Sequence, residues 1–207
     1  AKPFIKWVGG KSQLIEQLDA QLPADFGNWE NVTYIEPFVG GGAMLFYMLQ
    51  RYPNIQHAII NDINPDLATC YRTVRDTPEQ LIESLRDIEN AYLAIETEDG
   101  RKDFFMAARE RYNEKNLDPI ENSTKFFFLN RTCFNGLYRV NKKGFFNVPF
   151  GKYSNPTICD PETIRKDSEL LQRVEILNSD FEATFEHAHG DTPVSYTHLT
   201  LPTNREV

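Results

Sequence analysis

Cysteine is scarce in the sequence, and its spacing excludes two common kinds of stabilised site. The three cysteines, Cys70, Cys133 and Cys159, are an odd number and lie far apart along the chain. They fit neither a disulfide framework nor the paired spacing of a structural zinc site. We therefore expect reduced cysteines, no bound metal and a cytoplasmic protein.

Long hydrophobic runs are absent as well. The longest apolar stretch without a charge is Phe38–Leu49, twelve residues that include three glycines, and it is too short to span a bilayer. The first residues contain no apolar core of a secretory signal. They also lack an initiator methionine, so we expect the natural start to lie upstream or to have been removed. The sequence predicts no membrane association.

The composition excludes global disorder. Hydrophobic residues make up 41% and charged residues 25% of the 207 residues, as is usual for folded soluble proteins. This length fits one domain, or one domain that carries an inserted subdomain.

Charge is distributed unevenly along the chain. The net charge is −8, but residues 101–153 contain eleven Lys/Arg and five Asp/Glu, a local net of +6, which leaves −14 for the rest. Residues 122–153 contain six basic residues, nine aromatics and no acid. Basic residues interleaved with aromatics favour phosphate contact combined with base stacking. We therefore expect a nucleic acid or another polyanion to bind there.

Predicted elements alternate as in a doubly wound α/β sheet. We expect strands at 32–36, 57–62 and 174–178, helices at 12–22, 43–51, 65–77, 78–96, 102–113, 123–130, 161–171 and 181–187, and a hairpin turn at 141–144. The basic segment interrupts this alternation. It is therefore predicted to be an insertion in an α/β body.

Two glycine-containing motifs differ in what they indicate. Gly9-Gly10-Lys11-Ser12 is not a phosphate-binding P-loop, because the required earlier glycine is Ile5. The glycines at 40–42 instead follow a predicted strand and precede a helix, where backbone can approach a ligand closely. Asp62, twenty residues after Gly42, ends the next predicted strand and suits ribose hydroxyls. This pattern favours a ligand that contains adenosine.

Four motifs in this order resemble those of Dam-type DNA adenine methyltransferases. They are KWVGGK at 6–11, EPFVGGG at 36–42, NDIN at 61–64 and LNRTCFNGLYRVNKKGFFNVPFGKY at 129–153. The resemblance implies a Rossmann-like methyltransferase sheet with an inserted, mainly helical DNA-recognition subdomain. It further implies methyl transfer from S-adenosyl-L-methionine to the exocyclic amine of adenine in double-stranded DNA. The expected division is a body at 1–77 and 157–193, the insertion at 78–156 and a foreign-looking tail at 194–207.

The resemblance also assigns residues to the cofactor. These are Trp7, Lys11, Phe38, Gly40, Gly42, Asp62, Asp180 and Phe181. For the last two an alternative stays open, namely a helix cap followed by a core phenylalanine.

A second set of residues falls on family positions that contact DNA. These are Arg131, Phe134, Asn135, Leu137 and Arg139, with Lys142 and Lys143 suited to phosphates. Arginine can pair with the major-groove edge of guanine, and an aromatic can fill the stack when a base is flipped out. The adjacent aromatics Phe126–Phe128 are instead predicted to be core. A short palindrome such as GATC and a monomeric protein are expected.

One family motif is missing from the sequence. The family accepts the hydrogens of the adenine amine with an Asp-Pro-Pro-Tyr tetrad, and no such tetrad occurs among the 207 residues. From about Pro193 the sequence resembles nothing in the family and offers no obvious strand. We expect a truncated gene joined to unrelated coding sequence, with the C-terminal half of the sheet missing and no methyl transfer by this chain alone. A non-catalytic fragment that binds DNA, cofactor or both is the alternative.

Transfer to a cytosine carbon is disfavoured. That reaction uses a Pro-Cys nucleophile, and the three cysteines here follow Thr69, Thr132 and Ile158.

Overall fold

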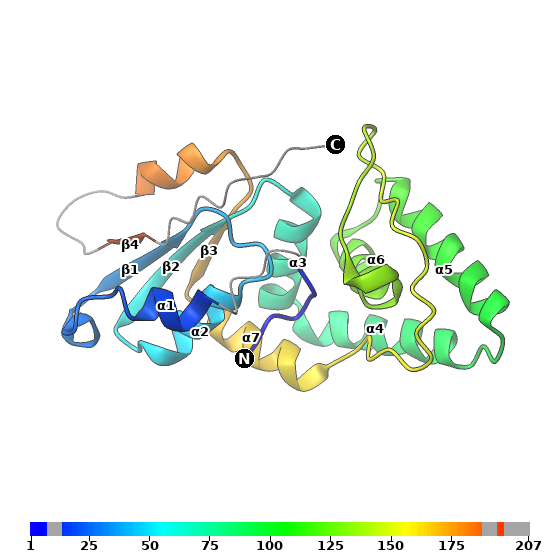
Figure 1. The fold of residues 1–207 in the computed structure, drawn as a ribbon, viewed down its shortest axis with the longest axis horizontal. Helices are drawn as coiled ribbons and strands as arrows, with labels where there is room; N and C mark the ends of the chain where they lie inside the picture. The colour runs from blue at the N-terminus through cyan, green and yellow to red at the C-terminus, as the bar shows by residue number, and fades with distance from the viewer. Residues whose placement is uncertain (8–13, 188–193, 197–207) are drawn as a thin grey trace.

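The computed structural model describes residues 1–7, 14–187 and 194–196, and its strands form one sheet (Figure 1). Within these residues the strand order is β3-β2-β1-β4, and all pairs are parallel. The bounds are β1 Val32–Glu36, β2 Ile55–Asn61, β3 Val174–Leu177 and β4 Val194–Tyr196. A parallel sheet connected by helices confirms the predicted α/β class.

The helices follow the predicted order. They are α1 Ile15–Asp19, α2 Ala43–Arg51, α3 Pro65–Asp76, α4 Pro78–Leu93, α5 Glu98–Asn113, α6 Pro119–Thr132 and α7 Pro161–Leu171, with the short 3-10 helices η2 Phe26–Asn28, η3 Phe134–Gly136 and η4 Phe181–His187. β1, α2 and α7 have the predicted bounds. The first helix is shorter than predicted, and residues 12 and 13 of that prediction lie outside the described residues. Within the described residues no helix is long and apolar enough to cross a membrane.

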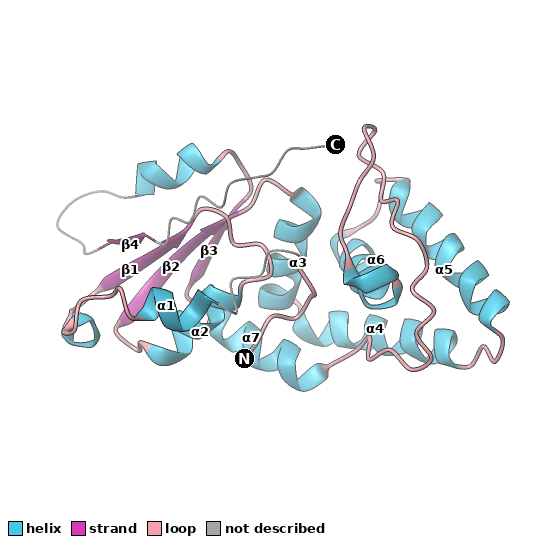
Figure 2. Ribbon diagram, in the orientation of Figure 1, coloured by secondary structure: helices cyan, strands magenta, loops and turns pink. Residues whose placement is uncertain are grey.

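The connections between strands put helices on both faces of the sheet (Figure 2). α7 packs against both α2 and α3 on one face, whereas η4 contacts β2 on the other. The chain steps outward from β1 to β2 to β3 and then returns to β4 beside β1. Right-handed crossovers place helices on opposite faces when the direction of stepping reverses. The point of reversal, between β1 and β4, is where open α/β sheets usually bind ligands.

The helices α4, α5 and α6 pack together beside the sheet as the bulk of the insertion (Figure 1). α6 lies against α3, α4 and α5. Phe126, Phe127 and Phe128 are all buried on it, which confirms their prediction as core. Phe127 stacks on Phe4 of the N-terminal segment at 5.3 Å between ring centroids. The insertion and the body therefore share one continuous hydrophobic core.

Three Asx-Pro pairs start helices in this chain. The side chains of Asn64, Asp118 and Asp160 accept hydrogen bonds from backbone N–H groups in the first turns of α3, α6 and α7. In each case proline takes the next position, where its missing N–H costs nothing. These three Asx-Pro pairs, none of which continues into an Asp-Pro-Pro-Tyr motif, therefore start helices.

The prediction that the tail offers no strand was wrong. β4 pairs in parallel with β1, with Thr33 opposite Val194 and Ile35 opposite Tyr196. The open edge of β1 supplies unpaired N–H and C=O groups, which a short segment can satisfy without apolar periodicity. Three residues are too few for such a pattern to show in the sequence.

The predicted hairpin turn is present, but its strands are minimal. Val140 and Phe146 form an isolated antiparallel bridge. Within the turn Gly144 N donates to Asn141 O at 2.9 Å, and the Asn141 side chain accepts from the backbone of Lys143 and Phe145. The turn is therefore held by the Asn141 side chain together with two backbone bonds across the hairpin, Asn141 N to Phe145 O at 2.9 Å and Asn147 N to Arg139 O at 3.1 Å.

Asp167 on α7 anchors the N-terminal segment. Its side chain is fully buried, and Oδ1 accepts a hydrogen bond from Lys2 N at 3.1 Å. Oδ2 has no hydrogen-bond partner among the described residues. Burial raises the pKa of this carboxyl to about 7, and the bond from Lys2 opposes the rise. Asp167 is thus partly protonated near neutral pH.

Asp167 predicts a specific pH dependence of stability. Between the ordinary pKa and about 7 the folded chain holds a proton that the unfolded chain has lost. The free energy of unfolding should therefore fall as pH rises, by up to about 1.4 kcal/mol per pH unit from this group. Urea titrations between pH 5 and pH 8 test this. Asp167→Asn should remove this contribution to the slope of unfolding free energy against pH. Parallel plots of unfolding free energy against pH for parent and variant would contradict the prediction.

Candidate functional site

The carboxyl ends of β1, β2 and β3 converge at one edge of the sheet, and Asn61 fastens them together. Asn61 ends β2 and is buried. Its Nδ2 donates to Pro37 O at 3.2 Å and to Ser179 O at 3.0 Å, while Oδ1 accepts from Ser179 N at 3.0 Å. One amide therefore joins the loop after β1 to the loop after β3. The motif NDIN at 61–64 does not by itself indicate this bridging role.

The loop after β1 needs its glycines. Gly40 and Gly42 have φ values of +51° and +75°. A Cβ on Gly40 would lie 2.8 Å from Cδ1 of Trp7, and one on Gly42 would lie 2.5 Å from the hydroxyl of Tyr71. That hydroxyl donates to Gly40 O at 2.9 Å. Conformation and close packing therefore both favour glycine at these two positions.

Asp62 holds the same loop from the next strand. Its Oδ2 accepts from Gly40 N at 3.1 Å, and Oδ1 accepts from Asn64 N at 3.0 Å. Burial raises the pKa of this carboxyl, and the two backbone hydrogen bonds oppose the rise. Each carboxylate oxygen can accept more than one hydrogen bond. The group is thus oriented at the sheet edge and retains capacity for hydroxyl donors of a ligand.

The segments that follow β1, β2 and β3 each expose one apolar side chain. Phe38 is 49% exposed, Ile63 76% and Phe181 37%. The two phenylalanine rings lie 5.5 Å apart at 37°. Exposed apolar side chains that gather beside an oriented carboxylate form a surface suited to a flat, partly polar ligand such as a nucleoside. Ile63 is a member that the sequence-based assignment did not include.

Asp180 and Phe181 behave differently from each other. Asp180 Oδ1 accepts from Glu182 N at 3.1 Å, as a capping residue of η4 would. Phe181 is exposed and is not the core residue of the alternative interpretation.

Trp7 reaches the glycine loop from the N-terminal segment. Its position is set by Asn130 on α6, which accepts from Lys6 N and donates to Lys6 O, both at 2.8 Å. The Trp7 ring stacks on Tyr138 at 5.3 Å. Lys11, the other residue predicted for this part of the site, lies outside the described residues.

The predicted DNA-contacting residues fall mostly on one exposed segment. Phe134, Asn135, Arg139, Lys142 and Lys143 are exposed there. The hairpin turn 141–144 projects at the top of the view in Figure 1. Arg139 is fixed in direction, because Nε donates to Asn147 Oδ1 at 2.7 Å. Leu137 is half-buried against the core. Sequence reasoning did not single out Val140 and Phe145, which expose apolar surface on the same hairpin.

Arg131 does not join that segment. Its Nη2 donates to Phe4 O at 2.7 Å, and burial lowers the pKa of the guanidinium. It lines a pocket of about 310 Å³ together with Lys6, Tyr153 and residues 154–157. The structure thus separates Arg131 from the exposed residues with which the resemblance groups it.

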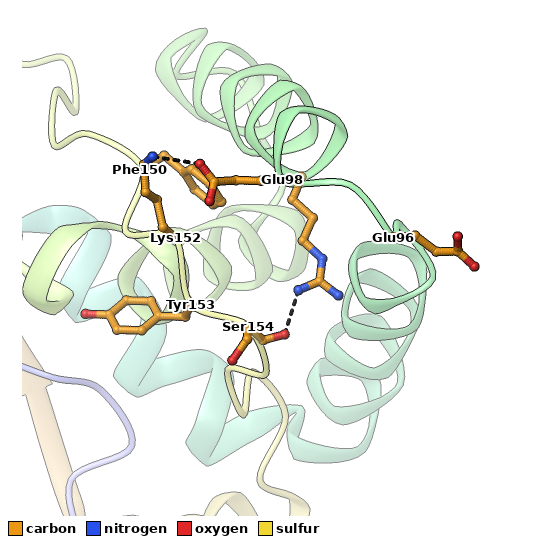
Figure 3. Close-up of a pocket in the computed structure, with 7 residues that line it drawn as sticks. Glu96, Glu98, Phe150, Lys152, Tyr153 and Ser154 are labelled. Carbon is orange, nitrogen blue, oxygen red and sulfur yellow. Dashed lines mark hydrogen bonds and ion pairs between the residues drawn. The ribbon is translucent and has the colours of Figure 1, made fainter.

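A second polar pocket, of about 180 Å³, shares Tyr153 and Ser154 with the first (Figure 3). Lys152 points across it to Glu98, and their charged groups are 2.7 Å apart. Arg101 donates to Ser154 O at 2.6 Å. Both cations are therefore engaged within the insertion, and neither points to the sheet edge. Among the described residues no group of three or more His, Cys, Asp or Glu could hold a metal ion.

Comparison with known proteins agrees with this geometry. The model of the family described as D12 class N6 adenine-specific DNA methyltransferase matches residues 7–197. The chain belongs to this family. The match includes residues 194–197, which sequence reasoning had assigned to a foreign-looking tail.

Several relatives cover nearly the whole chain. Type II methyltransferase M.MjaIII of Methanocaldococcus jannaschii is 43% identical over 99% of the chain and 71% of its own length. Type II methyltransferase M1.LlaDCHI of Lactococcus lactis is 37% identical over 92% of the chain and 63% of its length. The DNA adenine methylase of Haemophilus influenzae is 35% identical over 93% of the chain and 62% of its length. The chain thus spans about two thirds of the length of these relatives.

Proposed function

We propose that this chain forms the cofactor-binding and DNA-recognition parts of a site-specific DNA adenine methyltransferase. The reaction transfers a methyl group from S-adenosyl-L-methionine to the exocyclic amine of adenine in double-stranded DNA. The observation that carries the proposal is the sheet edge, where Asp62, the glycine loop and the exposed Phe38 and Phe181 lie together in a chain of this family.

The sheet is proposed to be the first part of a Rossmann-like methyltransferase sheet. In this proposal residues 1–77 and 157–193 make up the cofactor-binding body and residues 78–156 the DNA-recognition insertion. Residues 194–196 extend the sheet beside β1.

The cofactor residues are proposed from their positions at the sheet edge. Asp62 would accept hydrogen bonds from ribose hydroxyls, and Phe38 and Phe181, with Ile63, would offer apolar contact to adenine. Trp7 and the loop with Gly40 and Gly42 would border the methionine part. Asp180 and Lys11 are proposed from the resemblance.

When bound, S-adenosyl-L-methionine supplies an electrophilic methyl group on a sulfonium. The residues described here would bind and orient the reactants, and they do not include the Asp-Pro-Pro-Tyr acceptor of the adenine amine.

The insertion is proposed to bind the DNA. Arg139 would read a guanine edge, because an oriented guanidinium can donate two hydrogen bonds to one base. Phe134 and Asn135, with Leu137, would contact the bases around the target. Lys142 and Lys143 would contact phosphates, which position the protein without specifying sequence. Arg131 would contact the DNA from the pocket that it lines together with Lys6.

Asp62→Ala tests the cofactor site. Loss of charge-assisted hydrogen bonds costs about 1.5–3 kcal/mol, so the Kd for S-adenosyl-L-methionine should rise about 10- to 150-fold. Titration calorimetry on parent and variant measures it, with melting curves to verify folding. Asp103→Ala, an exposed acid on α5, is the matched control and should bind as the parent does. Equal affinities for Asp62→Ala and parent would remove the assignment, and a folded parent that binds nothing would refute the cofactor site.

Arg139→Ala and Lys142→Ala test the DNA surface. Arg139→Ala should lose about 1–3 kcal/mol of discrimination at one guanine position. Lys142→Ala should weaken binding to all DNA sequences alike and reduce the slope of log affinity against log salt concentration by about one. Fluorescence anisotropy on a GATC duplex and on single-base variants, over a series of salt concentrations, measures both effects. Lys166→Ala, on α7 of the body, should change neither. Identical sequence profiles for parent and Arg139→Ala would exclude base reading by this residue.

A further inference from the structure

Tyr138 lies between two residues predicted to touch DNA, Leu137 and Arg139, yet its side chain packs into the protein. Its ring stacks on Trp7 at 5.3 Å and 24°, and on Phe126 at 5.3 Å and 30°. Trp7 and Phe126 also stack on each other at 6.4 Å, so the three rings form one cluster that joins the N-terminal segment to α6. Tyr138, a residue of the segment 134–145 (the recognition segment), therefore packs directly on Trp7.

Trp7 also packs against the glycine loop. The space that a Cβ would need at Gly40 or Gly41 is filled by Trp7 atoms, at 2.8 Å and 3.0 Å. The indole thus packs directly on the backbone that borders the candidate cofactor site. Because interiors are close-packed, removing a ring that supports Trp7 would let the indole move away from the loop.

The hydroxyl of Tyr138 reaches the other half of the site. It lies 3.5 Å from Asp66 Oδ2. Asp66 also accepts from the Tyr112 hydroxyl at 2.5 Å and from Lys115 Nζ at 2.8 Å. Asn64 and Asp66 follow Asp62 closely in the chain. Tyr138 thus contacts both Trp7, which packs on the glycine loop, and Asp66, which lies four residues after Asp62.

We infer that Tyr138 is a positioning residue for S-adenosyl-L-methionine, acting through Trp7. This inference rests on the proposed function and deepens it. The DNA-recognition segment supplies part of the framework of the cofactor site, so that cofactor affinity depends on a residue that neither motif analysis nor exposure assigns to the cofactor.

The test compares S-adenosylhomocysteine binding by titration calorimetry in Tyr138→Leu, Tyr138→Phe and the parent chain. An aromatic pair of this geometry is worth enough that Tyr138→Leu should raise the Kd about tenfold. Tyr138→Phe keeps the ring, and its hydroxyl contact to Asp66 is long, so its Kd should stay within about twofold. Phe145→Leu, an exposed aromatic of the same insertion, is the matched control and should bind as the parent does. Tyr138→Met, whose longer and unbranched side chain adapts better to the space left by the ring, replaces the leucine variant where that one does not fold.

A spectroscopic readout separates positioning from general loss of structure. The sequence has two tryptophans, so Trp29→Phe leaves Trp7 as the single emitter. In that background Tyr138→Leu should shift the emission of Trp7 to the red while the far-ultraviolet circular dichroism is unchanged. Unchanged emission would overturn the inference.

A double-mutant cycle with Trp7→Leu gives the sharpest outcome. Because Tyr138 acts largely through Trp7, the Kd increases of the two single variants should not multiply in the double variant. Multiplying increases would overturn the inference, as would equal binding by Tyr138→Leu and parent, and both results leave the proposed function intact. A folded parent that binds no S-adenosylhomocysteine refutes the proposed function itself, and with it this role of Tyr138.

Discussion

The structure depends on one buried amide at the end of the second strand. Asn61 bonds to the backbone on both sides of it, at Pro37 and at Ser179. A buried amide left without these partners would cost about 1–3 kcal/mol for each unmet group. The bonds therefore fix where the loops after β1 and β3 emerge. Asp62, the next residue, then reaches Gly40 N. The candidate ligand site is thus a consequence of how parallel strands are fastened at their carboxyl ends.

The insertion also helps to build this edge of the sheet. α6 supplies Asn130, which hydrogen-bonds both backbone groups of Lys6 and so directs the N-terminal segment to the glycine loop. Exposed basic residues and exposed aromatics stay on the outward segment from Phe134 to Phe145. The net acidity of the chain therefore does not oppose DNA binding, because residues 134–145 carry three basic residues and no acid, and the acidic residues lie elsewhere in the chain. The same division separates the two proposed ligands.

Sequence reasoning identified the elements that carry strong local signals. β1 and α2 flank the glycine loop with the predicted bounds, because apolar periodicity and glycine both mark them. β4 was missed because its pairing is decided by the open edge of β1 and not by its own three residues. Asn61 and Ile63 were missed as site residues because burial of an amide and exposure of an isoleucine arise only from the fold. The inward direction of the Arg131 side chain was missed for the same reason, because it too arises only from the fold.

Hydrogen–deuterium exchange with and without S-adenosylhomocysteine tests the central claim most directly, since it reports which backbone the cofactor touches. If the carboxyl edge of the sheet is the cofactor site, the ligand should slow exchange in three separate stretches, residues 37–42, 61–64 and 179–183. The hairpin at 140–146 should exchange as before. Protection confined to the insertion, or a ligand that binds without protecting the loop 37–42, would contradict the account.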